Sequence, residues 1–229
     1  MRAGIVRQDI TANNLANSGT TGFKRDRFVL EQQVSGANTA NSKQLLDAVS
    51  ASRYTSFHPG PIESTESPLD FALQGPGFFV VADEAGQSFT RNGRFDRNSD
   101  GLLVDASGRR VQGQGGDITL PPGIVSVSER GEIAVDGALI DRLRVVDFSD
   151  SLALEKTGDG LFADPRSEAG QLALDSAAIQ QGFLEQSNVD AVQEMVEMIA
   201  TSRNYEASSR LMMTQDASLN HVVNDIGRV

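Results

Sequence analysis

Residues 188–226 read NVDAVQEMVEMIATSRNYEASSRLMMTQDASLNHVVNDI, a stretch that contains neither proline nor glycine. Apolar residues recur along it at alternating spacings of three and four, the period of one face of an α-helix. At about 1.5 Å per residue, a helix of this length is on the order of 60 Å long. A chain of 229 residues cannot bury such a helix along its whole length. The stretch therefore predicts a long helix that needs partners beyond its own chain.

One stripe of this helix mixes apolar with small and polar residues, namely Met195, Met198, Ser202, Tyr205, Ser209, Met212, Asp216, Leu219, Val223 and Ile226. Further apolar residues widen the stripe at its start: Val192, Val196 and Ile199. An ordinary helical hairpin core is one interpretation of this pattern. Its polar members Ser202, Ser209 and Asp216 argue against a sealed core, and they favour contacts between neighbouring subunits.

The N-terminal segment predicts a second helix, over residues 1–17. Its stripe has the same alternating spacing and consists of Ala3, Val6, Ile10, Asn13 and Asn17. Asparagine on such a seam weakens packing but can fix the register and the number of partners. A glycine-containing turn over residues 18–22 ends the helix, and an extended arm is predicted over residues 23–34.

Between the two helices the sequence changes character twice. Residues 36–68 are rich in Ala, Ser, Asn, Thr and Pro, which is typical of an extended connector with little regular structure. From residue 69 onward, short β-type runs alternate with glycine-containing turn pairs, as tight hairpins require. The predicted strands cover residues 78–81, 88–90, 102–104, 118–120, 124–127, 132–135 and 143–148.

We predict a mixed α and β fold. A mainly-β central domain is inserted between N- and C-terminal α-helices that form a coiled-coil-like core. The predicted segments are an N-terminal helix and arm (1–34), an extended connector (35–68), a central all-β domain (69–166), a return segment (167–187) and a long C-terminal helix (188–229).

Composition excludes several classes of function. The formal net charge of −11 and the pI of about 4.6 oppose binding to a nucleic-acid backbone, so we expect no nucleic-acid partner. The chain has no cysteine, which removes disulfides, thiolate metal sites and thiol nucleophiles. No stretch approaches the roughly 18 apolar residues of a membrane helix, and no cleavable signal peptide is recognisable. Export would therefore need a route other than the general secretory signal.

Few stretches of the sequence match a motif for metal binding or catalysis. Residues 96–101 (DRNSDG) match the first half of a calcium loop, but Ser107 stands at the twelfth position, where glutamate is required. A hairpin turn is the better interpretation. The chain has no tryptophan and only two tyrosines, so it lacks the aromatic platforms of a saccharide cleft, and it has no Gly-x-Ser-x-Gly motif. We therefore predict no enzymatic activity, no cofactor, no metal and no small-molecule substrate.

Several blocks of the sequence are similar to a known family. Residues 12–17 (ANNLAN) followed by 20–25 (TTGFKR) resemble the N-terminal signature of the flagellar basal-body rod, hook and hook-associated axial proteins. Further blocks follow in the family's order: 60–65 (GPIEST), 69–79 (LDFALQGPGFF), 89–95 (FTRNGRF), 100–104 (DGLLV), 181–189 (QGFLEQSNV), 194–196 (EMV) and 203–206 (RNYE). The segments 113–118 (GQGGDI) and 154–162 (LEKTGDGLF) resemble the proximal rod protein more than the distal one.

The resemblance implies a structural subunit of the bacterial flagellar rod, with the terminal helices inside a tubular filament and the β domain outside. It implies self-assembly into the axial drive shaft for motility. The implied partners are copies of the chain, other rod and hook-type axial proteins, and the flagellar export apparatus. It also implies an extracytoplasmic place in the basal body, reached without a cleaved signal peptide. Family members begin with further helix ahead of Met1, so we expect Met1 to be internal, truncated or a misassigned start.

From the stripes and the resemblance together we predict an assembly interface. It comprises Val6, Ile10, Asn13, Asn14, Leu15, Asn17, Gly22, Phe23, Lys24, Val192, Met195, Val196, Met198, Ile199, Tyr205, Met212, Leu219, Val223 and Ile226. The asparagines are expected to bond across helices, with local capping as the alternative. Phe23 and Lys24 are expected to anchor the turn between helix and arm, with Gly22 giving backbone freedom.

Two other functions stay open at this point. One is a secreted carbohydrate-binding or hydrolytic β domain with helical tethers, which would show a saccharide-dependent change in stability. The other is an adhesin or hook-cap-like accessory that shares the terminal signatures but not the place in the rod.

Overall fold

The structure, a computed structural model, describes residues 2–32, 49–84, 86–174 and 177–226. The chain divides into two compact units, each built from segments distant in sequence. The helical unit comprises Met1–Ala16, Asp26–Tyr54 and Asp190–Val229. The β unit comprises Asn17–Arg25 and Thr55–Val189.

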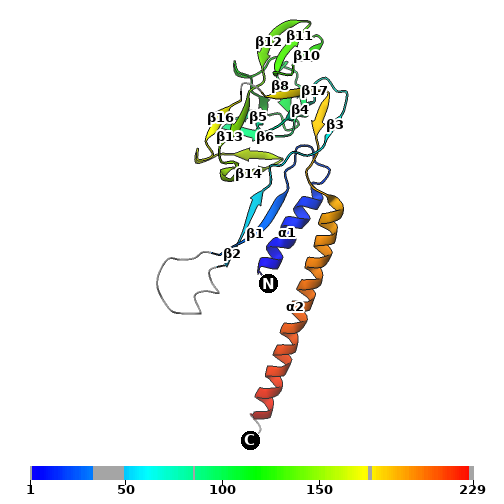
Figure 1. Cartoon of the computed structure of the whole chain (residues 1–229), viewed down its shortest axis with the longest axis vertical. Coiled ribbons are helices and arrows are strands. Elements are labelled where there is room, and N and C mark those ends of the chain that lie inside the picture. The colour runs from blue at the N-terminus through cyan, green and yellow to red at the C-terminus, as the bar shows by residue number, and fades with distance from the viewer. Residues whose placement is uncertain (1, 33–48, 85, 175–176, 227–229) are drawn as a thin grey trace. The chain divides into compact units, whose positions relative to one another are not determined.

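The helical unit contains both terminal helices, α1 (Arg2–Ala16) and α2 (Ala191–Ile226), which confirms the helices predicted at the two ends. Figure 1 shows α1 beside the first part of α2, the longer of the two. Asp190 caps α2, because its carboxylate accepts hydrogen bonds from the amides of Val192 at 2.9 Å and Gln193 at 3.1 Å. Strands β1 (Asp26–Gln32) and β2 (Val49–Thr55) pair as a two-stranded sheet.

The β unit is built around a nine-stranded sheet. The order along its main path is β14 (Glu155–Gly158), β15 (Leu161–Ala163), β6 (Gly86–Thr90), β5 (Phe78–Asp83), β9 (Arg110–Val111), β8 (Leu103–Asp105) and β7 (Phe95–Arg97). Two strands lie off this path: β13 (Val145–Phe148), which pairs with β5, and β16 (Gln171–Ala173), which pairs with β13. Every pairing in this sheet is antiparallel.

Smaller sheets complete the β unit. Three strands form a meander: β10 (Val125–Val127), β11 (Glu132–Val135) and β12 (Ala138–Arg142). Two pairs join early to late segments of the chain: β4 (Phe71–Gln74) with β17 (Ala178–Gln181), and β3 (Ile62–Ser64) with β18 (Phe183–Glu185). A short 3₁₀ helix, Ser151–Ala153, precedes β14.

The first four residues of β5, Phe78 to Val81, are buried on both faces of the strand, which explains their unbroken apolar run. Phe79 and Val81 belong to one core cluster, together with the ring of Phe95 at 5.4 Å from that of Phe79. Phe78 and Val80 point into a second cluster on the other side. Because successive side chains of a strand face opposite ways, a strand between two cores must be apolar at every position.

Several predicted strands are confirmed, and others differ. The runs at 78–81, 88–90, 102–104, 124–127, 132–135 and 143–148 correspond to β5, β6, β8, β10, β11 and β13. Residues 118–120 are not a strand, although Ile118 and Leu120 are buried, because this segment makes only isolated bridges. Strands β2 and β3 lie within the stretch predicted to have little regular structure, and β16 to β18 lie within the return segment. Their partners are distant in sequence, so a local pattern does not reveal them.

The calcium-like loop is a hairpin turn, as expected. It joins β7 to β8, and the side chain of Asn98 accepts hydrogen bonds from the amides of Asp100 at 3.0 Å and Leu102 at 2.9 Å. Such an asparagine turn uses its polar side chain to hold the loop backbone. Asn98 therefore accounts for the conformation of this loop as a hairpin turn.

Candidate assembly surface and buried charge cluster

The two terminal helices pack on each other along only part of α2. The buried residues of this seam are Ile10, Thr11 and Asn14 on α1, and Glu194 and Thr201 on α2. An ion pair between Arg7 and Glu197 lies beside it, with the Arg7 Nε 2.9 Å from Glu197 Oε1. After Thr201, none of the α2 side chains that the structure describes is buried. The intramolecular helix pair therefore ends well before α2 does.

Apolar side chains are exposed on two faces of α2. At about 100° per residue, Val192, Met195, Val196 and Ile199 share the face opposite Thr201, and we call these four the apolar patch. They are 66%, 45%, 63% and 56% exposed, respectively. On the face that continues the seam beyond α1, the exposed residues are Tyr205, Met212 and Leu219, which we call the distal stripe. Neither surface is covered by the described part of the chain.

The predicted interface residues thus divide into accessible and internal ones. The patch and the stripe are exposed, Met198, Val6 and Leu15 are half-buried, and Val223 and Ile226 lie in α2, although their side chains are not among those described. The internal ones are Ile10, Asn14, Gly22, Phe23 and Lys24. Sequence reasoning did not single out Leu211 and Met213, which are 66% and 68% exposed.

Asn14 bonds locally rather than across helices. Its amide Nδ2 donates to the carbonyl of Asp26 at 2.8 Å, and its Oδ1 accepts from the amide of Asp26 at 2.9 Å. The buried side chain thereby satisfies both backbone groups of one residue and fixes the start of β1 to α1. Asn13 is exposed, and Asn17 is half-buried and accepts a hydrogen bond from the Thr20 hydroxyl at 3.2 Å.

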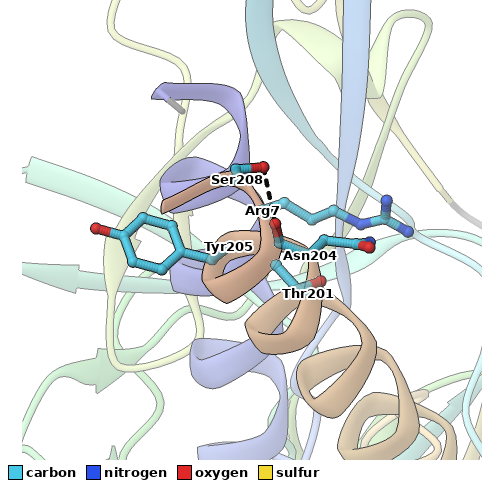
Figure 2. Close-up of a pocket in the computed structure, with 6 residues that line it drawn as sticks. Arg7, Thr201, Asn204, Tyr205 and Ser208 are labelled. Atoms are coloured by element: carbon cyan, nitrogen blue, oxygen red, sulfur yellow. Dashed lines mark hydrogen bonds between the residues drawn. The ribbon is translucent and has the colours of Figure 1, made fainter. Parts of the chain in front are cut away.

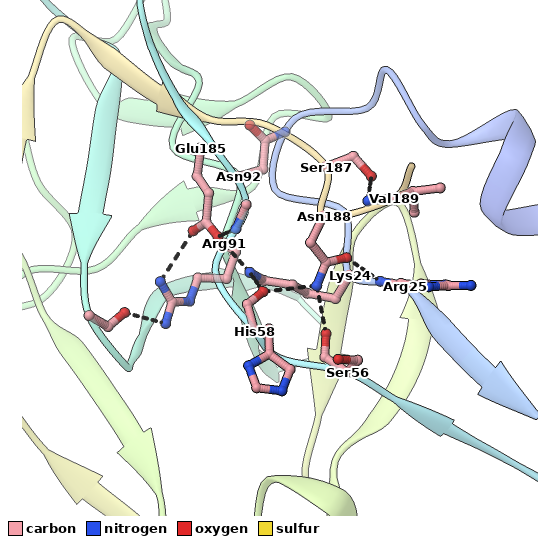
Figure 3. Close-up of polar contacts among 12 residues, drawn as sticks. Lys24, Arg25, Ser56, His58, Arg91, Asn92, Glu185, Ser187, Asn188 and Val189 are labelled. Carbon is pink, nitrogen blue, oxygen red and sulfur yellow. Dashed lines mark hydrogen bonds and ion pairs between the residues drawn. The ribbon is translucent and has the colours of Figure 1, made fainter. Parts of the chain in front are cut away.

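A buried cluster of charges lies inside the β unit and consists of Lys24, Arg91 and Glu185, which we call the charge cluster (Figure 3). Lys24 Nζ lies 2.5 Å from Glu185 Oε1, and Arg91 Nη1 lies 3.2 Å from Glu185 Oε2. The same Oε1 also accepts the amide of Gly60 at 2.8 Å. One carboxylate thus binds groups from three separate segments of the chain.

Burial disfavours the charged forms of both Lys24 and Arg91. Desolvation lowers the pKa of Lys24, and the attraction and hydrogen bond of Glu185 only partly oppose that effect. Desolvation likewise lowers the pKa of Arg91, again opposed by Glu185. The carbonyl groups of His58 and Gly75 accept further hydrogen bonds from Lys24 Nζ at 2.9 Å and Arg91 Nη2 at 2.7 Å. Glu185 is therefore the carboxylate that Lys24 and Arg91 share.

Asn188 extends this network to the backbone (Figure 3). Its Nδ2 donates to the carbonyls of Ser56 at 2.9 Å and His58 at 2.8 Å, and its Oδ1 accepts from the amide of Arg25 at 2.7 Å. The chain passes between the two units next to these residues, at 25/26, 54/55 and 189/190. One side chain thus fixes the positions of three segments where they enter the β unit. Sequence reasoning found the block around Glu185 and Asn188 but not these roles, which depend on long-range contacts.

Phe23 is buried beside the cluster, with Lys156 Nζ 4.1 Å from the centre of its ring. Lys156 also donates to the carbonyl of Lys24 at 2.7 Å. A cation over an aromatic face is attracted by the ring quadrupole. Phe23 and Lys24 therefore hold the turn that follows α1 from inside the β unit.

We expect Gly22→Ala to lower the free energy of unfolding of the β unit by at least about 2 kcal/mol. Gly22 has a φ of +69°, and an added Cβ would lie 2.4 Å from the backbone nitrogen of Asn92. Gly108→Ala is the matched control, because Gly108 has a φ of +82° with nothing within 4 Å of the Cβ position. Urea denaturation followed by circular dichroism measures both. Equal losses at the two sites would contradict the argument from close approach.

Two kinds of feature are absent from the described residues, a cluster of metal ligands and a helix that could span a bilayer. Within the ranges that the structure covers, no group of three or more His, Asp or Glu side chains could hold a metal ion. No helix in the same ranges is long and apolar enough to span a bilayer. What the geometry offers instead is exposed helical surface. A long helix with exposed apolar faces, in a chain that also contains a separate compact β unit, is typical of structural proteins that interact with partners.

Comparison with known proteins agrees with this class. Three family models match in order: "Flagella basal body rod protein" at residues 3–24, "Flagellar hook protein FlgE/F/G D1 domain" at 72–135, and "Flagellar basal body rod FlgEFG protein C-terminal" at 180–224. The chain is 35% identical to the flagellar basal-body rod protein FlgF of Caulobacter vibrioides, over 96% of this chain and 92% of that protein. It is 31% identical to the rod protein FlgG of Bacillus subtilis, over 94% of this chain and 92% of that one.

The chain belongs to the flagellar basal-body rod protein family. It is a structural rod subunit of the flagellar basal body and not an enzyme, as the sequence predicts. A further relative, the rod protein FlgF of Mesorhizobium japonicum, is 30% identical over 96% of this chain and 92% of that one. The FlgF relatives support the proximal rod type expected from the sequence.

Proposed function

We propose that this rod subunit self-assembles through its terminal helices into the axial drive shaft for motility. The exposed apolar surface of α2 carries the proposal. α1 covers only the first part of α2, and the distal stripe of Tyr205, Met212 and Leu219 continues the same face with its side chains exposed. Burial of apolar surface contributes roughly 25 cal/mol per Å², so helices of neighbouring subunits gain free energy by covering this face.

The proposed interface is narrower than the one predicted from sequence. The residues available to a partner are Val192, Met195, Val196, Ile199, Tyr205, Met212 and Leu219, and Val223 and Ile226 extend the stripe in sequence. A coiled-coil-like core would form where such stripes of several subunits meet. The internal residues, such as Asn14 and Lys24, would act indirectly by holding the helices and the turn in place.

The partners we propose are copies of this chain and other rod and hook-type axial proteins. The proposed route is the flagellar export apparatus, without signal cleavage, to an extracytoplasmic place in the rod. The five-segment organisation stays a prediction. The carbohydrate-binding alternative is not favoured, because Tyr54 and Tyr205 both belong to the helical unit and tryptophan is absent.

Hydrogen exchange on the free and the assembled protein tests this proposal. In the free chain we expect amides of residues 209–226 to exchange at least about tenfold faster than those of β5, because local opening is easy where few apolar contacts are buried. Assembly should protect this segment. Equal protection of 209–226 in free and assembled protein would overturn the proposal, and β5 serves as the internal control.

A further inference from the structure

A small pocket lies on the helical unit where α1 and α2 meet (Figure 2). Its volume is about 210 Å³, and its walls are Gly4, Arg7, Thr201, Asn204, Tyr205 and Ser208. We call it the helix pocket. An engineered apolar cavity of about 150 Å³ admits a benzene ring, so this space is sufficient for one aliphatic side chain.

Gly4 lies in the wall of this pocket, and nothing within the chain requires a glycine at that position. Its φ is not positive, and an added Cβ would meet nothing within 4 Å. Glycine is also among the poorest helix formers, at roughly 1 kcal/mol less favourable than alanine in a helix interior. Neither backbone conformation nor packing within the subunit requires glycine here. The space that it leaves is available to a group from outside the chain.

Two of the polar side chains that line the helix pocket, Arg7 and Ser208, are engaged in bonds within the unit. Arg7 is paired with Glu197, and Figure 2 shows its guanidinium turned away from the Tyr205 ring. The Ser208 hydroxyl donates to the carbonyl of Asn204 at 2.8 Å. The charge of Arg7 is thus already balanced, so the pocket suits an uncharged occupant.

The chain itself presents such an occupant. The apolar patch of Val192, Met195, Val196 and Ile199 carries no charge and is exposed. At about 100° per residue, the patch lies on the face of α2 opposite the pocket residues Thr201, Tyr205 and Ser208. A contact that joins opposite faces of one helix leaves a free pocket on one subunit and a free patch on the next. Such a contact is heterologous, and it extends into an open filament where its rotation does not close into a ring.

We propose that the helix pocket receives an aliphatic side chain from the apolar patch of a second copy of this chain. This inference rests on the proposed self-assembly and names its contact. Val196 and Ile199 lie at the centre of the patch and are the side chains that enter the pocket. Gly4 determines specificity, because any side chain at this position fills the space that the neighbour needs.

Disulfide trapping tests the contact between the helix pocket and the apolar patch. The chain has no cysteine, so only the introduced cysteines can form disulfides. Chains carrying Ser208→Cys are mixed with chains carrying Ile199→Cys or Val196→Cys, assembled, and oxidised. A disulfide forms only where Cβ atoms approach to roughly 4 Å. We expect mixed disulfides between the pocket and patch chains, and few between two identical chains. Gln8→Cys, an exposed position on α1 outside the pocket, replaces Ser208→Cys in the control mixture.

A second experiment adds Gly4→Leu to the chain that carries Ser208→Cys. We expect the mixed disulfide to fall at least about tenfold, equivalent to about 1.4 kcal/mol of binding, while the melting temperature of the free chain does not fall. Gly4→Ala should give an intermediate loss, and Gln8→Ala none.

The outcomes separate the contact from the proposed function. Chains that sediment as assemblies but form no more mixed disulfide than the Gln8→Cys control would overturn the contact and leave self-assembly intact. Disulfides mainly between two Ser208→Cys chains would overturn it in favour of a closed, symmetric contact. A mixed disulfide that survives Gly4→Leu would contradict the role of the pocket. Failure of the unmodified chain to sediment at any concentration would overturn self-assembly and the contact together.

Discussion

Replacing Glu185 by glutamine is expected to lower the free energy of unfolding of the β unit by roughly 3–5 kcal/mol, the cost of breaking a buried ion pair. Lys24, Arg91 and Glu185 are 0%, 4% and 1% exposed, so water cannot compensate the lost charge. The change leaves two buried cations without their shared carboxylate, although the amide preserves the shape. Urea denaturation followed by far-ultraviolet circular dichroism measures the loss.

Glu63→Gln is the matched control for this prediction. Glu63 is exposed on β3, opposite Leu184 of β18. The substitution therefore removes a carboxylate from the same strand pair but leaves no buried charge without a partner. We expect it to change stability by less than about 0.5 kcal/mol. Should Glu185→Gln fail to fold, Lys24→Met provides a milder test, because Glu185 keeps its bonds to Arg91 and the Gly60 amide. A loss below about 1 kcal/mol for Glu185→Gln would contradict the structural role of the cluster.

Introducing aspartate at both Met212 and Leu219 is expected to raise the concentration needed for assembly by at least about a hundredfold. These side chains are 49% and 62% exposed on the distal stripe, so the free chain should fold normally. In an assembled seam each carboxylate would be desolvated without a partner, which costs several kcal/mol per ion. Sedimentation over a range of concentrations measures the threshold.

The control for this pair keeps the positions and their apolar character. Met212→Leu with Leu219→Met conserves volume and polarity, a kind of exchange that usually costs less than about 1.5 kcal/mol even in a core. We expect it to assemble at nearly the original concentration. Unchanged assembly by the aspartate pair would remove the distal stripe from the interface, and a lowered melting temperature would show that the stripe packs within the subunit.

The two substitutions are expected to have separate effects, because they lie in different units of the chain. Glu185 lies in the β unit and the distal stripe lies in the helical unit. The first change should alter stability, and the second should alter association with little effect on the unfolding of the free chain. A large stability loss from the stripe variant would therefore contradict the assignment of separate roles.

Much of the fold could be predicted from local patterns. The helical period over residues 188–226 indicated α2, and the short alternating runs with glycine turns indicated strands such as β5 and β11. The two-residue and three-residue strands were harder to predict. β3 and β9, for example, contain too few residues to show a period, and each exists because a partner strand lies beside it.

The candidate site was predictable only in part. Exposed apolar residues such as Met212 and Leu219 followed from the excess of apolar positions on a helix too long to bury. The roles of the buried residues could not be predicted from the sequence. Asn14 was expected to bond across helices, yet it binds the backbone of Asp26, because the arm returns beside α1. Glu185 lies in the block 181–189 that resembles the family, but its burial was not predicted, since one acidic residue near a strand has no local signature of burial.

The sequence by itself determined where the two helices and several of the strands form and that α2 has unsatisfied apolar surface, because hydrophobic period and turn chemistry act over a few residues. The tertiary structure alone decided which charges are buried and which glycine leaves a pocket. Lys24 binds Glu185 across 161 residues of sequence, and Gly4 and Thr201 line one pocket only because α1 packs on α2. Such contacts depend on chain segments that are brought together by folding, and their energies arise from desolvation and close approach, which no local pattern encodes.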